Sequence, residues 1–150
     1  MSAKFSALLS GATSEQVEKI GKFAESIGIA FQIQDDLLNL DSSALSVGKG
    51  GIGEDIHEGK RSLMVIHTLQ NATPEDATRL QYILSLKTTD TCLIEEAISI
   101  MRKYDSFQFS RRKAQELVDA AWKEVESFLN ESPAKEKLKG LANFLISRNK

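Results

Sequence analysis

The chain has 150 residues, 41% of them hydrophobic, which is enough to bury the core of one domain and argues against a disordered polymer. Its 19 basic and 21 acidic residues give a formal net charge of −2, which excludes the basic excess that a general nucleic-acid binder needs. A single cysteine, Cys92, excludes an intrachain disulfide and favours a reducing compartment such as the cytoplasm, and no segment is apolar enough to predict a transmembrane helix.

Apolar residues recur at helical spacing along almost the whole chain, whereas the alternating pattern of a strand is nearly absent. We therefore predict an all-α fold that forms a single helical domain over residues 1–150. In chain order, the expected helices span residues 3–10, 14–40, 60–70, 74–86, 91–104, 107–130 and 134–147. Capping residues mark several helix starts, namely Thr13 with Gln16 as a capping box, Thr73 before Pro74, Asp90, and Ser132 before Pro133.

The first expected helix, residues 3–10, has no capping residue in front of it. Its apolar residues Phe5, Leu8 and Leu9 would lie on one face, as in a helix that is already under way. We therefore expect the chain to be one part of a larger helical fold.

The second expected helix, residues 14–40, is apolar on nearly every side, which is typical of a helix inside a bundle. A narrow polar strip interrupts this apolar surface. It consists of Gln32, Asp35, Asp36 and Asn39, and Gly21 and Gly28 lie on the same line.

Two adjacent carboxylates in a bundle interior would repel each other and lose their hydration. A bound cation would remove this cost, and because every donor in the strip is an oxygen, Mg²⁺ is the ion that fits best. The simpler alternative is that Asp35 and Asp36 cap a helix end or face water. The buried character of the helix and the loop that follows favour the metal site.

A glycine-rich loop follows at residues 41–55 and contains Lys49, and Lys60 comes five residues after its end. Glycines let backbone N–H groups approach phosphate closely, and lysines supply positive charge, so both lysines are candidates for phosphate binding. A Walker A loop is excluded because its two glycines would be one residue too far apart. His67, within LMVIHTL, is expected to be a satisfied core or groove histidine rather than a catalytic base.

The run GIAFQIQDDLLNL…GKGGIGEDIHEGKRSLMVIHTL, within residues 28–69, resembles the second aspartate-rich motif of the trans-isoprenyl diphosphate synthases, the polyprenyl synthetase family. The part GEDIHEGKRSLMVIHTL is most similar to archaeal-type short-chain enzymes that make farnesyl or geranylgeranyl diphosphate. The resemblance implies the C-terminal half of an isoprenoid-synthase helical bundle around a central cavity. It also implies a transferase that condenses an allylic diphosphate with isopentenyl diphosphate.

The same resemblance implies roles for individual residues. The catalytic residues would be Asp35, Asp36 and Lys60. The ligands of Mg²⁺, which bridges to the allylic diphosphate, would be Asp35, Asp36 and Asn39. The substrate-binding residues would be Phe31, Gln32, Lys49, Asp55 and Lys60. The chain departs from the family pattern at Asn39, where many members have a third Asp, and in a spacing from Lys49 to Asp55 that is one residue longer than usual.

The family's first aspartate-rich motif does not occur in this sequence. We therefore expect the chain to be inactive alone, to need a complementary N-terminal half or subunit, and to form a homo- or hetero-oligomer, since dimers are usual in the family. The main alternative is a non-catalytic small subunit that regulates a full-length synthase. A purely structural helical domain and a class I terpene cyclase, whose second metal motif is missing after Asp36, rank lower.

Overall fold

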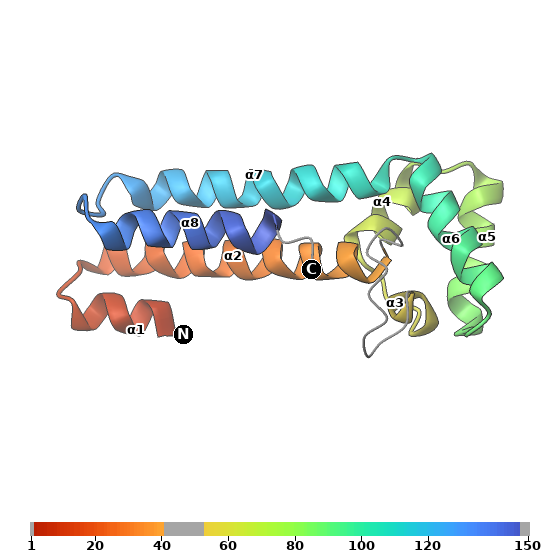
Figure 1. Cartoon of the computed structure of the whole chain (residues 1–150), viewed down its shortest axis with the longest axis horizontal. Coiled ribbons are helices and arrows are strands. Elements are labelled where there is room, and N and C mark those ends of the chain that lie inside the picture. The colour runs from red at the N-terminus through yellow and green to blue at the C-terminus, as the bar shows by residue number, and fades with distance from the viewer. Residues whose placement is uncertain (1, 41–52, 148–150) are drawn as a thin grey trace. The chain divides into compact units, whose positions relative to one another are not determined.

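The computed structural model of the protein describes residues 2–40 and 53–147, and every regular element in these residues is a helix (Figure 1). In chain order the helices are α1 (Ser2–Leu9), α2 (Ser14–Leu40), α3 (Glu54–His57), α4 (Leu63–Asn71), α5 (Pro74–Leu86), α6 (Thr91–Lys103), α7 (Ser106–Glu126) and α8 (Pro133–Ser147). The prediction of an all-α fold is therefore confirmed. None of these helices combines the length and the apolar character that a membrane crossing requires.

The capping residues predicted from the sequence make the expected hydrogen bonds. At the start of α2, Thr13 Oγ1 accepts the N–H of Gln16 at 3.3 Å, and the Gln16 side chain accepts the N–H of Thr13 at 2.9 Å. The other predicted caps each accept a backbone N–H from the first turn of their helix, and they are Thr73, Asp90 and Ser132. These bonds explain why the starts of four helices could be predicted from the sequence.

Some boundaries differ from the prediction. The helix expected at residues 60–70 is α4, which begins at Leu63. The helix expected at residues 107–130 is α7, which ends at Glu126. The helix α3 was not predicted, because a single turn of four residues is too short to show a periodic apolar pattern.

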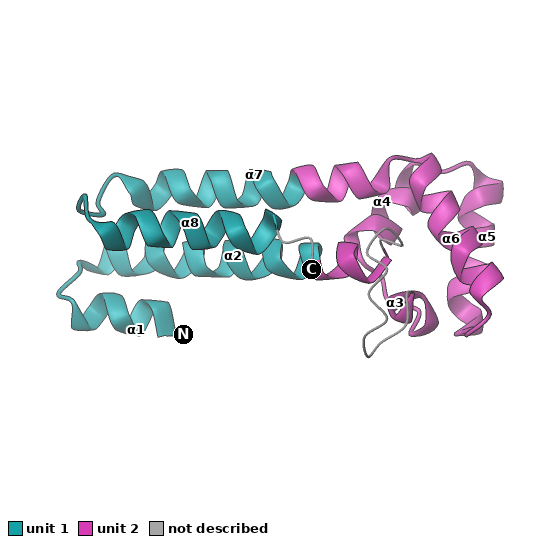
Figure 2. Cartoon of the chain, viewed as in Figure 1, with its two compact units in different colours: residues 1–34, 113–148 teal, residues 35–112, 149–150 magenta. Residues whose placement is uncertain are grey.

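The chain divides into two compact units (Figure 2). The first unit comprises residues 1–34 and 113–148, and the second comprises residues 35–112 and 149–150. The boundaries at residues 34 and 112 fall inside the long helices α2 and α7. The single helical domain over residues 1–150 stays a prediction.

The first unit is built from α1, the first part of α2, the last part of α7, and α8. Phe23 of α2 meets Trp122 of α7 edge to face, with ring centroids 6.0 Å apart. Other buried residues of this core include Val17, Val125 and Ala142. These side chains come from three different helices, so the apolar contact holds the unit together.

Several apolar side chains of the first unit remain exposed. On α2, Ile29 is 47% exposed and Ala24 is also exposed, so the prediction that this helix is buried on nearly every side is wrong for this chain. The core of the unit covers only one side of α2, which leaves the opposite apolar residues without cover. Further exposed apolar residues are Phe5, Leu8 and Leu9 on α1, and Leu141 and Phe144 on α8.

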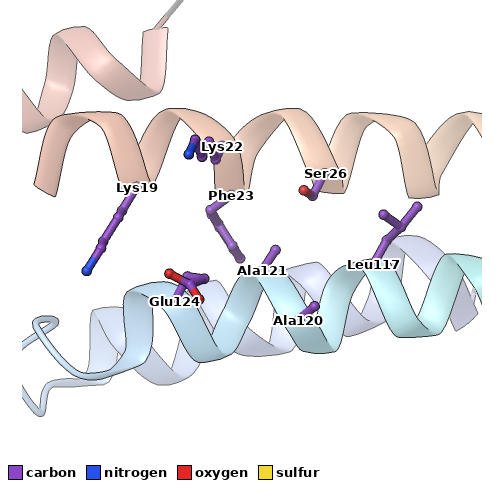
Figure 3. Close-up of a pocket in the computed structure, with 8 residues that line it drawn as sticks. All are labelled: Lys19, Lys22, Phe23, Ser26, Leu117, Ala120, Ala121 and Glu124. Carbon is purple, nitrogen blue, oxygen red and sulfur yellow. The ribbon is translucent and has the colours of Figure 1, made fainter. Parts of the chain in front are cut away.

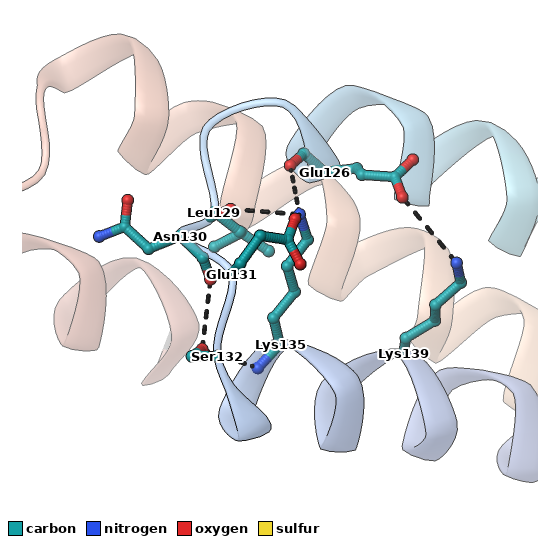
Figure 4. A network of polar contacts seen from close by, with 7 residues as sticks. All are labelled: Glu126, Leu129, Asn130, Glu131, Ser132, Lys135 and Lys139. Carbon is teal, nitrogen blue, oxygen red and sulfur yellow. Dashed lines mark hydrogen bonds and ion pairs between the residues drawn. The ribbon is translucent and has the colours of Figure 1, made fainter.

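A buried lysine closes the turn between α7 and α8 (Figure 4). The side chain of Lys135 is only 7% exposed, and its Nζ donates to the carbonyl oxygens of Glu126 at 3.0 Å and Leu129 at 3.2 Å. It also donates to the carboxylate of Glu131 at 2.6 Å. The last carbonyls of a helix lack intrahelical partners, so this lysine satisfies the carbonyl of Glu126 at the end of α7 and that of Leu129 in the turn that follows.

The second unit contains α3, α4, α5 and α6, which pack on one another, together with the end of α2 and the first part of α7. Its fully buried side chains include Ile56, Met64, Leu80, Ile83 and Met101. Two glycines with positive φ bring the α3 segment close to its neighbours. A Cβ at Gly53 would collide with Ile94 of α6, and a Cβ at Gly59 would lie 2.9 Å from the carbonyl oxygen of Leu84 of α5.

Candidate functional site

The two adjacent carboxylates near the end of α2 have different surroundings. Asp36 is 7% exposed, whereas Asp35 is exposed. Successive residues of a helix point about 100° apart, so neighbours in sequence do not share one environment. The prediction that both carboxylates lie in a buried strip is therefore wrong for Asp35, and it is Asp36 that carries the cost of burial.

Lys60 offsets the buried charge of Asp36. Its Nζ donates to Asp36 Oδ1 at 2.7 Å and to the two carboxylate oxygens of Asp55 at 3.2 and 3.1 Å. The side chain of Lys60 is 36% exposed, while that of Asp55 is 12% exposed. One ammonium group thus bridges two largely buried carboxylates from a side chain that is partly exposed. We name these three residues the acid–lysine cluster.

The pKa shifts in the acid–lysine cluster reflect competition for one ammonium group. Burial lowers the pKa of Lys60, but its hydrogen bonds to Asp36 and Asp55 outweigh burial and raise that pKa above its usual value. Burial raises the pKa of Asp55, and the hydrogen bond from Lys60 offsets only part of this rise. The shorter contact of Lys60 goes to Asp36, so Asp55 receives the smaller share of the positive charge.

The end of α2 is joined to the start of α3 through Asn39. The side-chain Oδ1 of Asn39 accepts the N–H of Asp55 at 3.1 Å, and its backbone carbonyl accepts the N–H of Gly53 at 3.2 Å. The carbonyl of Asp55 in turn accepts the N–H of Lys60 at 2.9 Å. These hydrogen bonds to the backbone therefore fix the positions of the Asp55 and Lys60 main chain, from which their side chains extend.

The donor set of the acid–lysine cluster fits a hard divalent cation that is shared with another ligand. Two carboxylates against one ammonium leave a net charge of about −1 when all three groups are charged. Within residues 2–40 and 53–147, no three or more His, Cys, Asp or Glu side chains gather in a way that would hold a metal ion by themselves. Mg²⁺ commonly takes one or two carboxylates and completes its shell with waters and phosphate oxygens, so the cluster suits that arrangement.

The sequence model of the family described as Polyprenyl synthetase matches residues 1–101. The chain belongs to the polyprenyl synthetase family. This finding confirms the resemblance seen in residues 28–69 and extends it to the start of the chain.

Individual relatives of this polyprenyl synthetase chain agree with the assignment. A short chain isoprenyl diphosphate synthase from Methanothermobacter thermautotrophicus is 36% identical over 145 residues, which cover 97% of this chain and 43% of that relative. The crystal structure of a decaprenyl diphosphate synthase from Rhodobacter capsulatus matches with a TM-score of 0.84 at 26% identity, covering 98% of this chain and 45% of that one. A geranylgeranyl pyrophosphate synthase from Corynebacterium glutamicum, solved with calcium and isoprenyl diphosphate, matches with a TM-score of 0.78 at 26% identity.

The match to these proteins is partial on their side. The structure from Corynebacterium glutamicum is covered over 43% of its length, although 95% of this chain takes part. The polyprenyl synthetase chain therefore spans less than half the length of the relatives that it matches. The fold is shared over nearly all of this chain, and the rest of each relative has no counterpart in it.

The other predicted substrate-binding residues lie outside the acid–lysine cluster or outside the described residues. Phe31 is half-buried and Gln32 is exposed, and both belong to the first unit, so their part in the site stays a prediction. Lys49 lies outside the described residues. Of the predicted set, the structure brings together Asp36, Asp55 and Lys60, and Asn39 joins them through its hydrogen bond to the backbone of Asp55.

A hydrogen-bond chain in the second unit was not predicted from the sequence. Thr68 Oγ1 donates to the carbonyl of Met64 at 2.8 Å, so it can only accept from Ser106 Oγ, which lies 2.7 Å away. Ser106 then has no proton left for His67, so His67 Nδ1, at 2.9 Å, donates to Ser106. His67 also stacks on Phe109, which agrees with the prediction of a satisfied structural histidine. No sequence signal links positions 38 residues apart, such as Thr68 and Ser106.

A groove lies between α2 and α7 in the first unit (Figure 3). Its volume is about 460 Å³, and its lining includes Phe23, Leu117 and Ala121, with Lys22 and Glu124 also present. None of its lining residues belongs to the acid–lysine cluster. The groove is therefore not part of the candidate site.

Proposed function

We propose that this polyprenyl synthetase chain provides the diphosphate-binding part of a Mg²⁺-dependent prenyltransferase. The reaction is the condensation of an allylic diphosphate with isopentenyl diphosphate, of the short-chain farnesyl or geranylgeranyl type. The observation that carries this proposal is the ammonium group of Lys60, which contacts both Asp36 and Asp55 on a side chain that is 36% exposed. The relative solved with calcium and isoprenyl diphosphate supports a divalent ion and an isoprenyl diphosphate as ligands.

Each residue of the acid–lysine cluster has a proposed task. Asp36, with Asp35 beside it, holds Mg²⁺, and Asp55 keeps Lys60 in place. Lys60 stays protonated because its pKa is raised, so it can bind a phosphate oxygen as a positive charge. Bound Mg²⁺ supplies electrostatic stabilisation of the diphosphate as it leaves the allylic carbon. Lys60 adds to this stabilisation from a fixed position, which is effective because no reorganisation is needed during the reaction.

We further propose that a complementary N-terminal half or subunit completes the enzyme. This chain spans 43% of the length of its short-chain relative and contains no first aspartate-rich motif. The exposed apolar residues of the first unit, such as Phe5, Leu9 and Phe144, are a surface that another protein segment could cover. A dimeric or hetero-oligomeric assembly in the cytoplasm is part of this proposal, and the single cysteine supports the reducing compartment.

A condensation assay tests the proposed function. The chain is supplied with Mg²⁺, an allylic diphosphate and radiolabelled isopentenyl diphosphate, alone and mixed with the part of the Methanothermobacter relative that this chain does not match. We expect no product from the chain alone and product from the mixture, with the product lost when the chain carries Lys60→Met. Product from the chain alone would contradict the need for a second part, and binding without product would favour a regulatory subunit.

A further inference from the structure

The amide side chain of Asn39 has a structural partner that its position in the motif did not suggest. Residues 41–52 separate the end of α2 from Gly53 in the sequence, and Asn39 makes hydrogen bonds to residues that follow them. Its backbone carbonyl accepts the N–H of Gly53, and its Oδ1 accepts the N–H of Asp55. One residue at the end of α2 therefore fixes both the entry to α3 and the second residue of that helix.

The helix α3 lacks a cap of its own. The first N–H groups of a helix have no partner within it, and an N-cap side chain normally accepts the N–H of the second or third residue. The N-cap position of α3 is Gly53, which makes no side-chain capping bond. A larger residue there would collide with Ile94, so the cap cannot be supplied locally. Asn39 Oδ1 accepts the N–H of Asp55, the second residue of α3, and so replaces the missing cap from another helix.

We propose that Asn39 is a positioning residue of the site rather than a metal ligand. Its amide oxygen caps α3 and thereby holds Asp55 and Lys60 against Asp36. The N–H of Lys60 donates to the carbonyl of Asp55, so fixing Asp55 also fixes the backbone of Lys60. The Nζ of Lys60 then contacts both carboxylates. The inference rests on the proposed function only in taking these three residues as the site, because the cap itself needs no ligand.

This role explains why an amide suffices at the position. A hydrogen-bond acceptor is needed to receive the N–H of Asp55, whereas a negative charge is not. An aspartate would accept the same N–H and would also be favourable near the start of a helix. An isosteric apolar side chain would leave the N–H of Asp55 without its partner.

Three variants of the full chain separate the two roles of Asn39. Asn39→Leu removes the acceptor at similar size, and Asn39→Asp restores an acceptor oxygen. Asn71→Leu is the matched control, because Asn71 also belongs to the second unit but its side chain donates to the carbonyl of His67, at 2.8 Å, within its own helix. If Asn39→Leu does not fold, Asn39→Ala removes the oxygen without adding bulk and serves in its place.

The measurement is amide hydrogen exchange by NMR, with EDTA present and without diphosphate. We expect the Asp55 amide of Asn39→Leu to exchange roughly five- to tenfold faster than in the wild type. Asn39→Asp should retain the wild-type rate at Asp55, and Asn71→Leu should leave it unchanged. An unchanged Asp55 rate in Asn39→Leu would overturn the proposal, and so would a loss of protection spread evenly over α4, α5 and α6.

A second readout connects the cap to ligand binding. Calorimetry with Mg²⁺ and pyrophosphate should give weaker binding for Asn39→Leu and near wild-type binding for Asn39→Asp. Weaker binding with unchanged exchange at Asp55 would mean that Asn39 is a metal ligand, which overturns the positioning role. If pyrophosphate does not bind the wild-type chain at all, the proposed function fails, whereas the exchange experiment still decides the role of Asn39.

Discussion

At the scale of single residues, the candidate site depends on Lys60. A buried carboxylate is tolerated only when its charge is paired, and Asp36 and Asp55 share this one lysine. The sequence motif identified all three residues, but it could not show that Lys60 bridges both acids. That contact arises from the segment 53–60, in which α3 holds Asp55 and the backbone bond from Lys60 to Asp55 places the lysine.

The variant Lys60→Met tests this dependence. It should lower the free energy of unfolding by about 2 kcal/mol at pH 7, because Asp36 and Asp55 both lose the ammonium group that contacts them. The expected loss is smaller than for a fully buried pair, since Lys60 is 36% exposed and water relieves part of the repulsion. Urea denaturation measures the change.

The matched control for Lys60→Met is Arg61→Met, which removes a positive charge from the adjacent, exposed position. Its effect should stay within about 0.5 kcal/mol. The loss in Lys60→Met should also shrink as the pH falls and Asp55, whose pKa is raised by burial, becomes protonated. Equal losses in the two variants would show that Lys60 does not stabilise the cluster.

At the scale of elements, the helix starts were predictable and the short connections were not. Helix starts are marked by capping residues that accept a backbone N–H only two or three positions away, so the signal is local. These residues are Thr13, Thr73, Asp90 and Ser132. The helix α3 depends instead on Asn39, 16 residues from its partner Asp55, and such a pairing has no local signal. The helical period also predicts an angle of about 100° between the side chains of Asp35 and Asp36. It does not predict which of the two is buried in the second unit.

The start of α5 is joined to the end of α6 by Asp76, and this link should depend on pH. Hydrogen bonds from Lys103, first, and from Tyr104 lower the pKa of Asp76 below its usual value of 3.8. A carboxyl group with a lowered pKa in the folded state stabilises the protein above its unfolded pKa. That contribution is lost as the pH falls below about 4 and through the lowered value.

Asp76→Asn tests this link through the melting temperature, measured from pH 7 down to pH 2.5. The variant should melt below the wild type at pH 7, and the difference should narrow steadily below about pH 4. The control Glu75→Gln removes an exposed carboxylate from the same helical turn and should show a smaller difference. A difference between Asp76→Asn and wild type that stays constant down to the lowest pH would contradict the account.

At the scale of the whole molecule, the sequence indicated the family. The motif in residues 28–69 carried the resemblance, and the structural match then extended to 98% of this chain. The exposed apolar side chains of α2 were not predicted, because a periodic pattern shows that a side of a helix is apolar but not whether another element covers it. Apolar side chains are also exposed on α1 and α8. In the relatives, more than half of the length lies outside the matched region.

The central claim is that the acids at the end of α2 bind a divalent ion together with diphosphate. Its most direct test is the melting temperature of the full chain with and without Mg²⁺ and pyrophosphate. Ligands at about 100 times their dissociation constant should raise the melting temperature by about 5 to 10 °C. Asp35→Asn/Asp36→Asn should abolish this rise, whereas Asp76→Asn should keep it. A rise that survives in the double variant would contradict the account.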